Sequence, residues 1–229
     1  MKPHHRIWEI DFARGLAILL MILFHLIVDL KDFYGFPLEY LSGFWYFEGK
    51  LSAILFIFLA GISCVLSKRT LSHGLKIFSW GMVLTIITYY YNPYTFIRFG
   101  ILHLIGSSIL SYKLLNGLSS ANLLVSSLIV LFAGNKISAI GISTGCLLPL
   151  GLTPPGFQAM DYYPLLPWYG VFLLGVVTGR RFYANRSSLL PFFLHPAIIT
   201  VPGRYSLLIY LIHQPLLLTI LYCCHWVLS

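Results

Sequence analysis

Long runs of apolar residues recur along the whole chain, and they constrain its fold more than any other feature. A helix needs about 20 mostly apolar residues to cross the hydrocarbon core of a bilayer. The expected fold is therefore all-α, a polytopic integral membrane helical bundle of about seven transmembrane helices in a single domain, residues 1–229. The expected crossings are 11–30, 50–67, 74–91, 98–114, 118–133, 164–181 and 204–226.

The composition excludes the common classes of soluble protein. Hydrophobic residues make up 58% of the 229 residues and charged residues only 10%, whereas a soluble globular chain has about 25% charged residues. A soluble enzyme, a disordered protein and an ordinary nucleic-acid-binding module do not fit. The 15 basic residues outnumber the 7 acidic ones, but they lie between the apolar runs, where membrane topology explains them better than nucleic acid does.

The distribution of Lys and Arg predicts a multi-pass protein of the cell membrane with a cytoplasmic amino terminus. In that orientation, 11 of the 15 basic residues lie inside if the apolar segment 137–152 does not cross. If that segment is an eighth crossing, the division becomes 7 inside and 8 outside, which the positive-inside tendency disfavours. The segment is short and holds three glycines and a proline, so a re-entrant or surface segment is the favoured alternative.

The first apolar run carries the ionisable residues that most need an explanation, because each one inside a span costs about 3 kcal/mol unless it is paired or lines a cavity. Arg14 and His25 are 11 residues apart, so they share a helix face and lie about 16 Å apart along the axis. Asp29 follows one turn beyond His25, and Asp11 is placed to pair with Arg14. A carboxylate at that position can hold the imidazole in one tautomer, as a general base requires; a satisfied core histidine is the alternative.

Other polar residues lie within or beside the remaining spans. Arg98 and His103 are five residues apart and do not share a helix face, and snorkelling to the interface is the alternative role for Arg98. His213 lies two residues before Pro215, and an intramembrane proline often marks a kink beside a cavity. Four residues near the outer loops face a substrate or serve as interface anchors: Trp45, Glu48, Asp161 and Trp168.

No metal site is expected from the sequence. The cysteines, at positions 64, 146, 223 and 224, have neither metal-ligand spacing nor the arrangement of a disulfide framework. No pair of histidines has the spacing of a zinc motif, and there is no phosphate-binding glycine loop.

Four stretches of the chain resemble a known family of membrane proteins. They are similar to small prokaryotic proteins related to heparan-alpha-glucosaminide N-acetyltransferase, within the transmembrane acyltransferase superfamily. The Arg-x10-His spacing of Arg14 and His25 also resembles the signature of the type 3 acyltransferase family. The stretches are RIWEIDFARGLAILLMILFHLIVDL at 6–30, FGILHLIGSSIL at 99–110, DYYPLLPWYGVFLLGVVTGRRFY at 161–183 and GRYSLLIYLIHQPLL at 203–217.

The resemblance implies transfer of an acyl group, acetyl by default, from cytoplasmic acyl-CoA to an amine or hydroxyl acceptor, often on a sugar, at the other membrane face. It casts His25, oriented by Asp29, as the catalytic base and Arg14 as a group that binds the donor. Arg98 and His103 are expected to help bind the cofactor. Both a monomer and a homo-oligomer are compatible with the sequence. The expected substrate-binding residues are Trp45, Glu48, Asp161, Trp168 and His213.

Two further hypotheses come from other classes of protein. A proton-coupled small-molecule transporter would use the intramembrane His and Asp residues as proton relays, but the chain is short and shows no inverted repeat. A structural membrane protein that binds a partner helix would leave the polar face of the first helix unexplained. Binding of acetyl-CoA separates the enzyme from the transporter.

Overall fold

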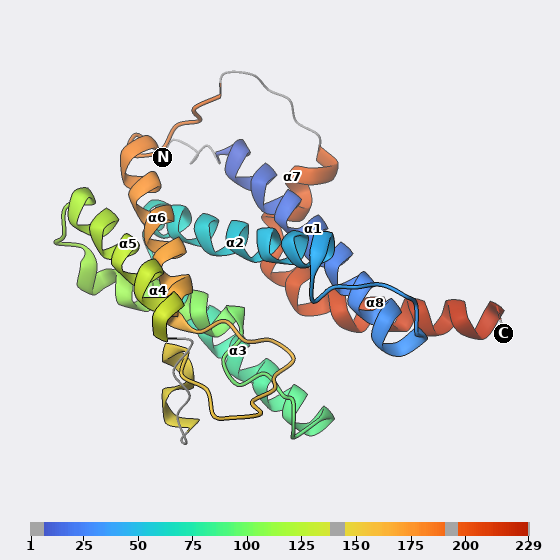
Figure 1. Ribbon diagram of the computed structural model, residues 1–229. Coiled ribbons are helices and arrows are strands. Elements are labelled where there is room, and N and C mark those ends of the chain that lie inside the picture. The colour runs from blue at the N-terminus through green and yellow to red at the C-terminus, as the bar shows by residue number, and fades with distance from the viewer. Residues whose placement is uncertain (1–6, 138–144, 191–196, 229) are drawn as a thin grey trace. The chain divides into compact units, whose positions relative to one another are not determined.

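The computed structural model describes residues 7–137, 145–190 and 197–228, and these form helices joined by loops (Figure 1). Within the described residues, the only strand-like pairing is an isolated bridge between Phe99 and Tyr162. The predicted all-α fold is confirmed. The helices are α1 (Trp8–Tyr34), α2 (Gly43–Leu66), α3 (Thr70–Tyr91), α4 (Ile101–Leu115), α5 (Ser120–Ile137), the 3-10 helix η1 (Gly145–Leu150), α6 (Leu165–Phe182), α7 (Ala197–Arg204) and α8 (Ser206–Leu228).

Each predicted crossing overlaps one of these helices, and the last, 204–226, also includes the final residue of α7. Among the described residues, four helices are long and apolar enough to span a bilayer, namely α1, α2, α3 and α8, while α4 and α5 give shorter apolar segments. Large apolar side chains stay exposed, as lipid contact requires: Ile86, Ile129 and Leu216 each expose 55% or more of their surface. The chain is a helical membrane protein, and the number of seven crossings stays a prediction.

The segment 137–152 falls partly outside the described residues, which omit 138–144. Its described part includes Gly145–Leu150, a 3-10 helix of 6 residues with a proline inside. At about 2.0 Å per residue such a helix is about 12 Å long, whereas the hydrocarbon core is about 30 Å thick. The described part of the segment therefore does not form a helix that crosses the membrane.

The end of α1 is set by local chemistry. Gly35 adopts a left-handed conformation with φ 70°, and its N–H donates to the carbonyl of Lys31 at 3.0 Å. The N–H of Phe36 donates to the carbonyl of Leu30 at 3.1 Å. This paired capping satisfies carbonyls that the helix end would otherwise leave open. α1 therefore extends four residues past the predicted end at residue 30.

The chain divides into two compact units: unit 1 comprises Met1–Phe56 and Ser187–Ser229, and unit 2 comprises Ile57–Arg186. The boundary falls within α2, so the first half of α2 belongs to unit 1 and the second half to unit 2. The single domain expected from the sequence stays a prediction.

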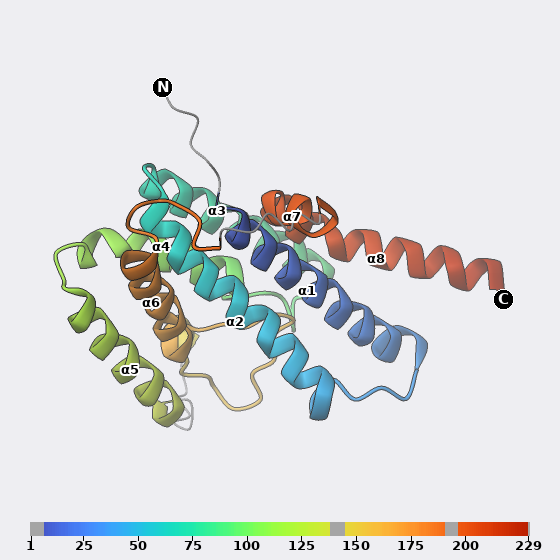
Figure 2. The same cartoon turned by 90° about the horizontal axis from the view of Figure 1, so that it is seen from above.

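In unit 1, α7 packs directly against the first half of α1, and the two helices lie side by side in Figures 1 and 2. Two buried glycines make the approach possible. A Cβ atom on Gly15 would meet the carbonyl oxygen of Ile199, and one on Gly203 would meet the carbonyl oxygen of Asp11. Small residues at such a crossing let two helix backbones come close, so this contact positions the end of α7 beside Asp11.

The first half of α2 is tied to α1 by a buried hydrogen bond and a close approach. The hydroxyl of Ser52 donates to the carbonyl of Ala17 at 3.0 Å, and a Cβ on Gly49 would meet the ring of Phe24. In the loop between the two helices, the hydroxyl of Tyr40 donates to Asp32 at 3.0 Å. Partial burial, reinforced by that carboxylate, raises the pKa of Tyr40.

Unit 2 is also built on small residues at helix contacts. A Cβ on Gly61 of α2 would meet the carbonyl of Phe172, and a Cβ on Gly175 of α6 would meet the carbonyl of Phe58. The hydroxyl of Ser127 on α5 donates to the carbonyl of Gly170 on α6 at 2.8 Å. The long loop before α6 is held in part by Tyr162, whose hydroxyl donates to the carbonyl of Leu148 at 2.7 Å; burial raises the pKa of Tyr162 to about 12.

Candidate functional site

Two histidine rings meet in unit 1, one from α1 and one from α8. The ring centroids of His25 and His213 are 4.8 Å apart, with an angle of 84° between the ring planes. The Nδ1 atom of His25 lies 2.9 Å from the carbonyl oxygen of Met21, and that of His213 lies 2.6 Å from the carbonyl oxygen of Tyr210. A carbonyl oxygen only accepts, so each Nδ1 carries the hydrogen and each neutral ring keeps its lone pair on Nε2. Both imidazoles are thus arranged to accept a proton at Nε2.

Asp29, one turn beyond His25 on α1, bonds to α8. The side-chain amide of Gln214 donates from Nε2 to Oδ1 of Asp29 at 2.7 Å, and Asp29 is only 1% exposed. This contact differs from the expected one, in which Asp29 orients the His25 ring. The carbonyl of Met21 orients that ring instead, because a helical side chain leans back toward the preceding turn and reaches the carbonyl four residues earlier.

We call His25, Asp29, His213 and Gln214 the α1–α8 cluster. Three of its buried polar atoms have no hydrogen-bond partner among the described residues: Asp29 Oδ2, Gln214 Oε1 and His213 Nε2. With the tautomer and amide orientation given above, all three are acceptors. Leaving a buried acceptor unmatched costs about 1–3 kcal/mol, and native proteins rarely do so. The cluster therefore fits a ligand that brings N–H or O–H donors.

Glu48 is another buried carboxyl group of unit 1. It lies on α2 and is 6% exposed, and neither of its carboxyl oxygens has a hydrogen-bond partner among the described residues. Trp45 lies three residues earlier on α2, where its ring packs against that of Phe44 at 5.0 Å. A buried carboxyl group needs donors in the same way as the α1–α8 cluster does, so Glu48 keeps its predicted substrate-binding role as a hypothesis, and Trp45 keeps its own.

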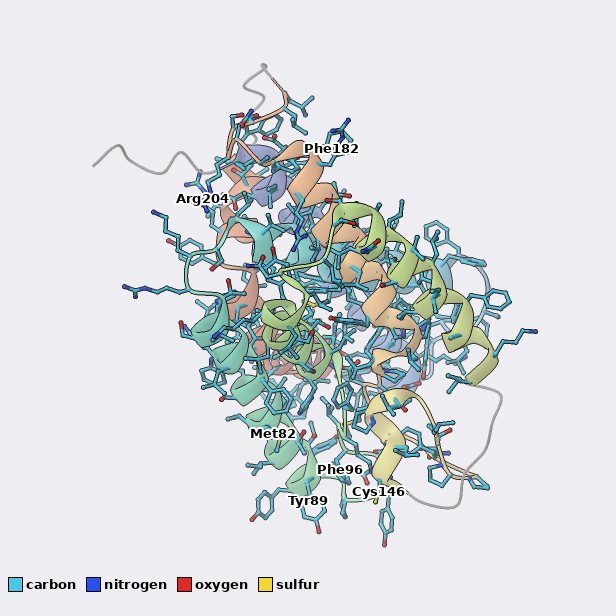
Figure 3. The ribbon with its side chains drawn as sticks, turned by 90° about the vertical axis from the view of Figure 1, so that its left-hand side faces the viewer. Met82, Tyr89, Phe96, Cys146, Phe182 and Arg204 are labelled. Atoms are coloured by element: carbon cyan, nitrogen blue, oxygen red, sulfur yellow. The ribbon has the colours of Figure 1, made fainter. Side chains whose placement is uncertain are left out.

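At the amino-terminal end of α1, one buried carboxylate contacts two arginines. Asp11 is 4% exposed; its Oδ1 lies 3.3 Å from Nη1 of Arg14, and its Oδ2 lies 3.5 Å from Nε of Arg204. The predicted pairing of Asp11 with Arg14 is confirmed. Arg204, labelled in Figure 3, ends α7, and the sequence did not single it out.

Arg98 of unit 2 lies between aromatic rings. Its guanidinium carbon is 4.9 Å from the ring centre of Phe96 and 5.2 Å from that of Phe157. Phe96 in turn packs against Tyr89 at 5.1 Å (Figure 3). Attraction between a cation and the faces of aromatic rings accounts for this position. A role for Arg98 in cofactor binding stays a prediction.

His103 of unit 2 uses both ring nitrogens within the protein. Its Nδ1 accepts the N–H of Gly100 at 3.2 Å, so its Nε2 carries the hydrogen and donates to the hydroxyl of Thr85 at 3.3 Å. The Thr85 hydroxyl in turn donates to the carbonyl of Ile97 at 2.7 Å. His103 therefore closes the amino-terminal end of α4. Both ring nitrogens have protein partners, and the part of His103 in cofactor binding stays a prediction.

Asp161 and Trp168, both expected near a substrate, also belong to unit 2. Asp161 accepts the N–H of Ile101 through Oδ2 at 2.9 Å, which caps the first turn of α4, where helices favour a carboxylate. The ring of Trp168 packs edge to face on Tyr163 at 5.1 Å. These contacts are structural, and substrate binding by either residue stays a prediction.

The predicted site residues thus fall into the two units. Unit 2 holds Arg98, His103, Asp161 and Trp168, and unit 1 holds Arg14, His25, Asp29, Trp45, Glu48 and His213. Sequence reasoning missed Gln214, although an amide in an apolar helix is costly and signals a partner. Among the described residues no group of three or more His, Cys, Asp or Glu side chains is arranged to hold a metal ion.

Comparison with known proteins identifies a family. Residues 6–215 match the family model described as heparan-alpha-glucosaminide N-acetyltransferase, catalytic. No curated protein matches the chain, and no solved structure matches it. The matched range includes α1 and the part of α8 that carries His213 and Gln214. This chain therefore belongs to the heparan-alpha-glucosaminide N-acetyltransferase catalytic family, as a transmembrane member of this group of acyltransferases.

Proposed function

We propose that this protein moves an acyl group, acetyl by its family, from acyl-CoA to an amine or hydroxyl acceptor, with His25 as the general base. The observation that carries the proposal is the α1–α8 cluster. It combines an imidazole with its Nε2 lone pair available and three buried acceptor atoms without partners among the described residues. A proton acceptor beside a set of hydrogen-bond acceptors suits the acceptor side of an acyl transfer.

His25 takes the proton of the acceptor group at Nε2 while the acceptor nitrogen or oxygen bonds to the thioester carbonyl carbon. The bond between that carbon and the CoA sulfur breaks, and His25 returns its proton to the departing thiolate, so the ring ends neutral. The Met21 carbonyl holds the Nδ1 hydrogen throughout and stabilises the imidazolium that forms. The donor and the acceptor are the only reactants that this step needs.

The rest of the α1–α8 cluster binds the acceptor in this proposal. Asp29 Oδ2, Gln214 Oε1 and His213 Nε2 each receive an N–H or O–H from it. A small molecule or glycan with several such donors, as in an amino sugar, meets this requirement, whereas an apolar acceptor leaves the three atoms unmatched. Trp45 and Glu48, also in unit 1, are candidates for further contacts with the same molecule.

The donor lies along the amino-terminal half of α1 in this proposal. Arg14 is placed to pair with CoA phosphate groups, and His25 lies about 16 Å further along the same helix face, a separation that suits an extended thioester arm. The distribution of basic residues over seven crossings favours the cytoplasmic side of a cell membrane for this end of α1.

The test uses the purified protein in detergent. Acetyl-CoA at 100 times its dissociation constant should stabilise the fold by about 2.7 kcal/mol, visible as a raised melting temperature. Acetyl transfer to a panel of amino sugars and polyols should occur with the natural chain and His73→Ala, an exposed histidine of α3, and be lost in a folded His25→Ala variant. Full activity of His25→Ala refutes the assignment of the base. A pH-dependent flux into proteoliposomes without affinity for CoA supports the transporter instead.

A further inference from the structure

The end of α7 brings a second guanidinium to the buried carboxylate of α1. The close approach at Gly15 and Gly203 seats α7 on α1, and Arg204 follows Gly203 directly. As a result Asp11 contacts Arg14 through one oxygen and Arg204 through the other. The helix contact and the buried carboxylate thus bring the two arginines to the two oxygens of one side chain.

The charges at this contact are mostly positive. Asp11 carries a formal charge of −1 and Arg14 and Arg204 each carry +1, so the three side chains sum to +1. Glu9, the next acidic residue on α1, accepts hydrogen bonds from the Ser188 hydroxyl and the Leu189 N–H, both at 2.7 Å. Its two oxygens are thus engaged by neutral donors of the 188–189 segment.

The second arginine also keeps an accessible surface. The side chain of Arg204 is 41% exposed, against 5% for Asp11. Its ion pair with Asp11 engages Nε and leaves the four N–H donors of the two terminal nitrogens out of that contact. A planar fork of donors held in place at one edge is suited to a phosphate group, which it can bind through two parallel hydrogen bonds.

We propose that Arg204, held in place by Asp11, binds a phosphate group of the CoA portion of the donor together with Arg14. The inference rests on the proposed function, since it assigns a residue to the donor end of the same site. CoA carries its phosphates at the end opposite the thioester. Phosphate binding at the amino-terminal end of α1 therefore directs the thioester along α1 toward His25. Asp11 is a positioning residue, because it touches the guanidinium groups and not the donor.

The test compares the binding of three probes to the full-length protein in detergent by calorimetry: CoA, dephospho-CoA, which lacks the 3′-phosphate, and pantetheine, which lacks all phosphates. Loss of one charge-assisted contact weakens binding about tenfold or more. Arg204→Ala should therefore weaken the binding of CoA by that factor and leave the binding of pantetheine unchanged. If Arg204→Ala weakens the binding of CoA but not of dephospho-CoA, Arg204 contacts the 3′-phosphate. If it weakens the binding of both CoA and dephospho-CoA, Arg204 contacts the diphosphate. Lys31→Ala, which removes a cation at the opposite end of α1, is the matched control and should bind all three probes normally.

Arg204→Gln guards against a folding defect, because it keeps a polar side chain with N–H donors beside Asp11 while it removes the charge. It should weaken CoA binding, and the difference from the natural chain should shrink as salt rises. If Arg204→Gln binds CoA as tightly as the natural chain does, the inference is overturned. It is also overturned if the variant loses the same factor of affinity for CoA and for pantetheine. If the natural chain itself binds neither CoA nor acetyl-CoA, the proposed function fails and the inference with it. If it binds and transfers acetyl groups while Arg204→Gln is normal, only the inference fails.

Discussion

Gln214 donates a hydrogen bond from Nε2 to Oδ1 of Asp29 at 2.7 Å, across 185 positions of sequence. This bond joins α8 to α1 beside the two histidine rings, which are 4.8 Å apart. It also leaves Asp29 Oδ2 and Gln214 Oε1 buried without a partner among the described residues. One contact therefore both connects the two helices and orients the acceptor atoms of the proposed site.

Replacing Gln214 with Leu should destabilise the protein. Asp29 would lose the donor to Oδ1 while it stays buried, and an unmatched buried polar atom costs about 1–3 kcal/mol. The change is measured as a lower melting temperature in detergent and a smaller free energy of unfolding. Gln158→Leu, at the exposed glutamine of unit 2, is the matched control and should shift stability by less than about 0.5 kcal/mol. Equal effects of the two variants would show that the bond to Asp29 contributes nothing.

Adding a methyl group at the contact between α1 and α7 should be costly. In Gly15→Ala and in Gly203→Ala, the new Cβ meets a backbone carbonyl oxygen that cannot move aside as a side chain can. Overpacking of this kind costs about 1–3 kcal/mol, and urea or thermal unfolding should report it. At Gly117 a Cβ meets nothing within 4 Å, so Gly117→Ala should be neutral. If Gly15→Ala is as stable as the unsubstituted protein, the two helices do not pack as described.

His103→Ala should reduce stability rather than donor affinity. The variant removes the acceptor for the Gly100 N–H and the donor to Thr85, and loss of a helix cap costs about 0.5–2 kcal/mol. Thr85→Val, which removes one of these partners, should have a smaller effect in the same direction. Melting curves and CoA titrations of the folded protein measure the two properties separately. A variant that melts normally but no longer binds CoA would instead establish the predicted cofactor role of His103.

Two substitutions of Asp161 should destabilise the protein to different degrees. Asp161→Ala removes the oxygen that accepts the Ile101 N–H and should cost about 1 kcal/mol, whereas Asp161→Asn keeps an acceptor and should cost less. Glu39→Ala breaks the exposed ion pair with Lys31 and serves as a control, with an expected loss below about 1 kcal/mol. Melting temperatures rank the three variants. If Asp161→Ala matches Glu39→Ala, capping of α4 does not explain why an acidic residue stands at position 161.

The sequence by itself determined the features that depend on local geometry. Apolar runs of helical length predict the membrane helices because backbone groups in lipid must be satisfied within the segment. The spacing of Asp11 and Arg14 places the two side chains one turn apart on any helix, and they pair as expected at 3.3 Å. The family was also accessible from the sequence, since its characteristic residues lie in a few continuous stretches.

Only the tertiary structure decided which side chains from distant segments meet. The partner of Asp29 is Gln214, the second partner of Asp11 is Arg204, and the ring facing His25 is that of His213. Each contact depends on which helix packs against α1 and at what depth, and that choice rests on close backbone approaches such as the one at Gly15. A glycine in a sequence does not say which backbone approaches it, because the energy of that contact exists only once both helices are in place.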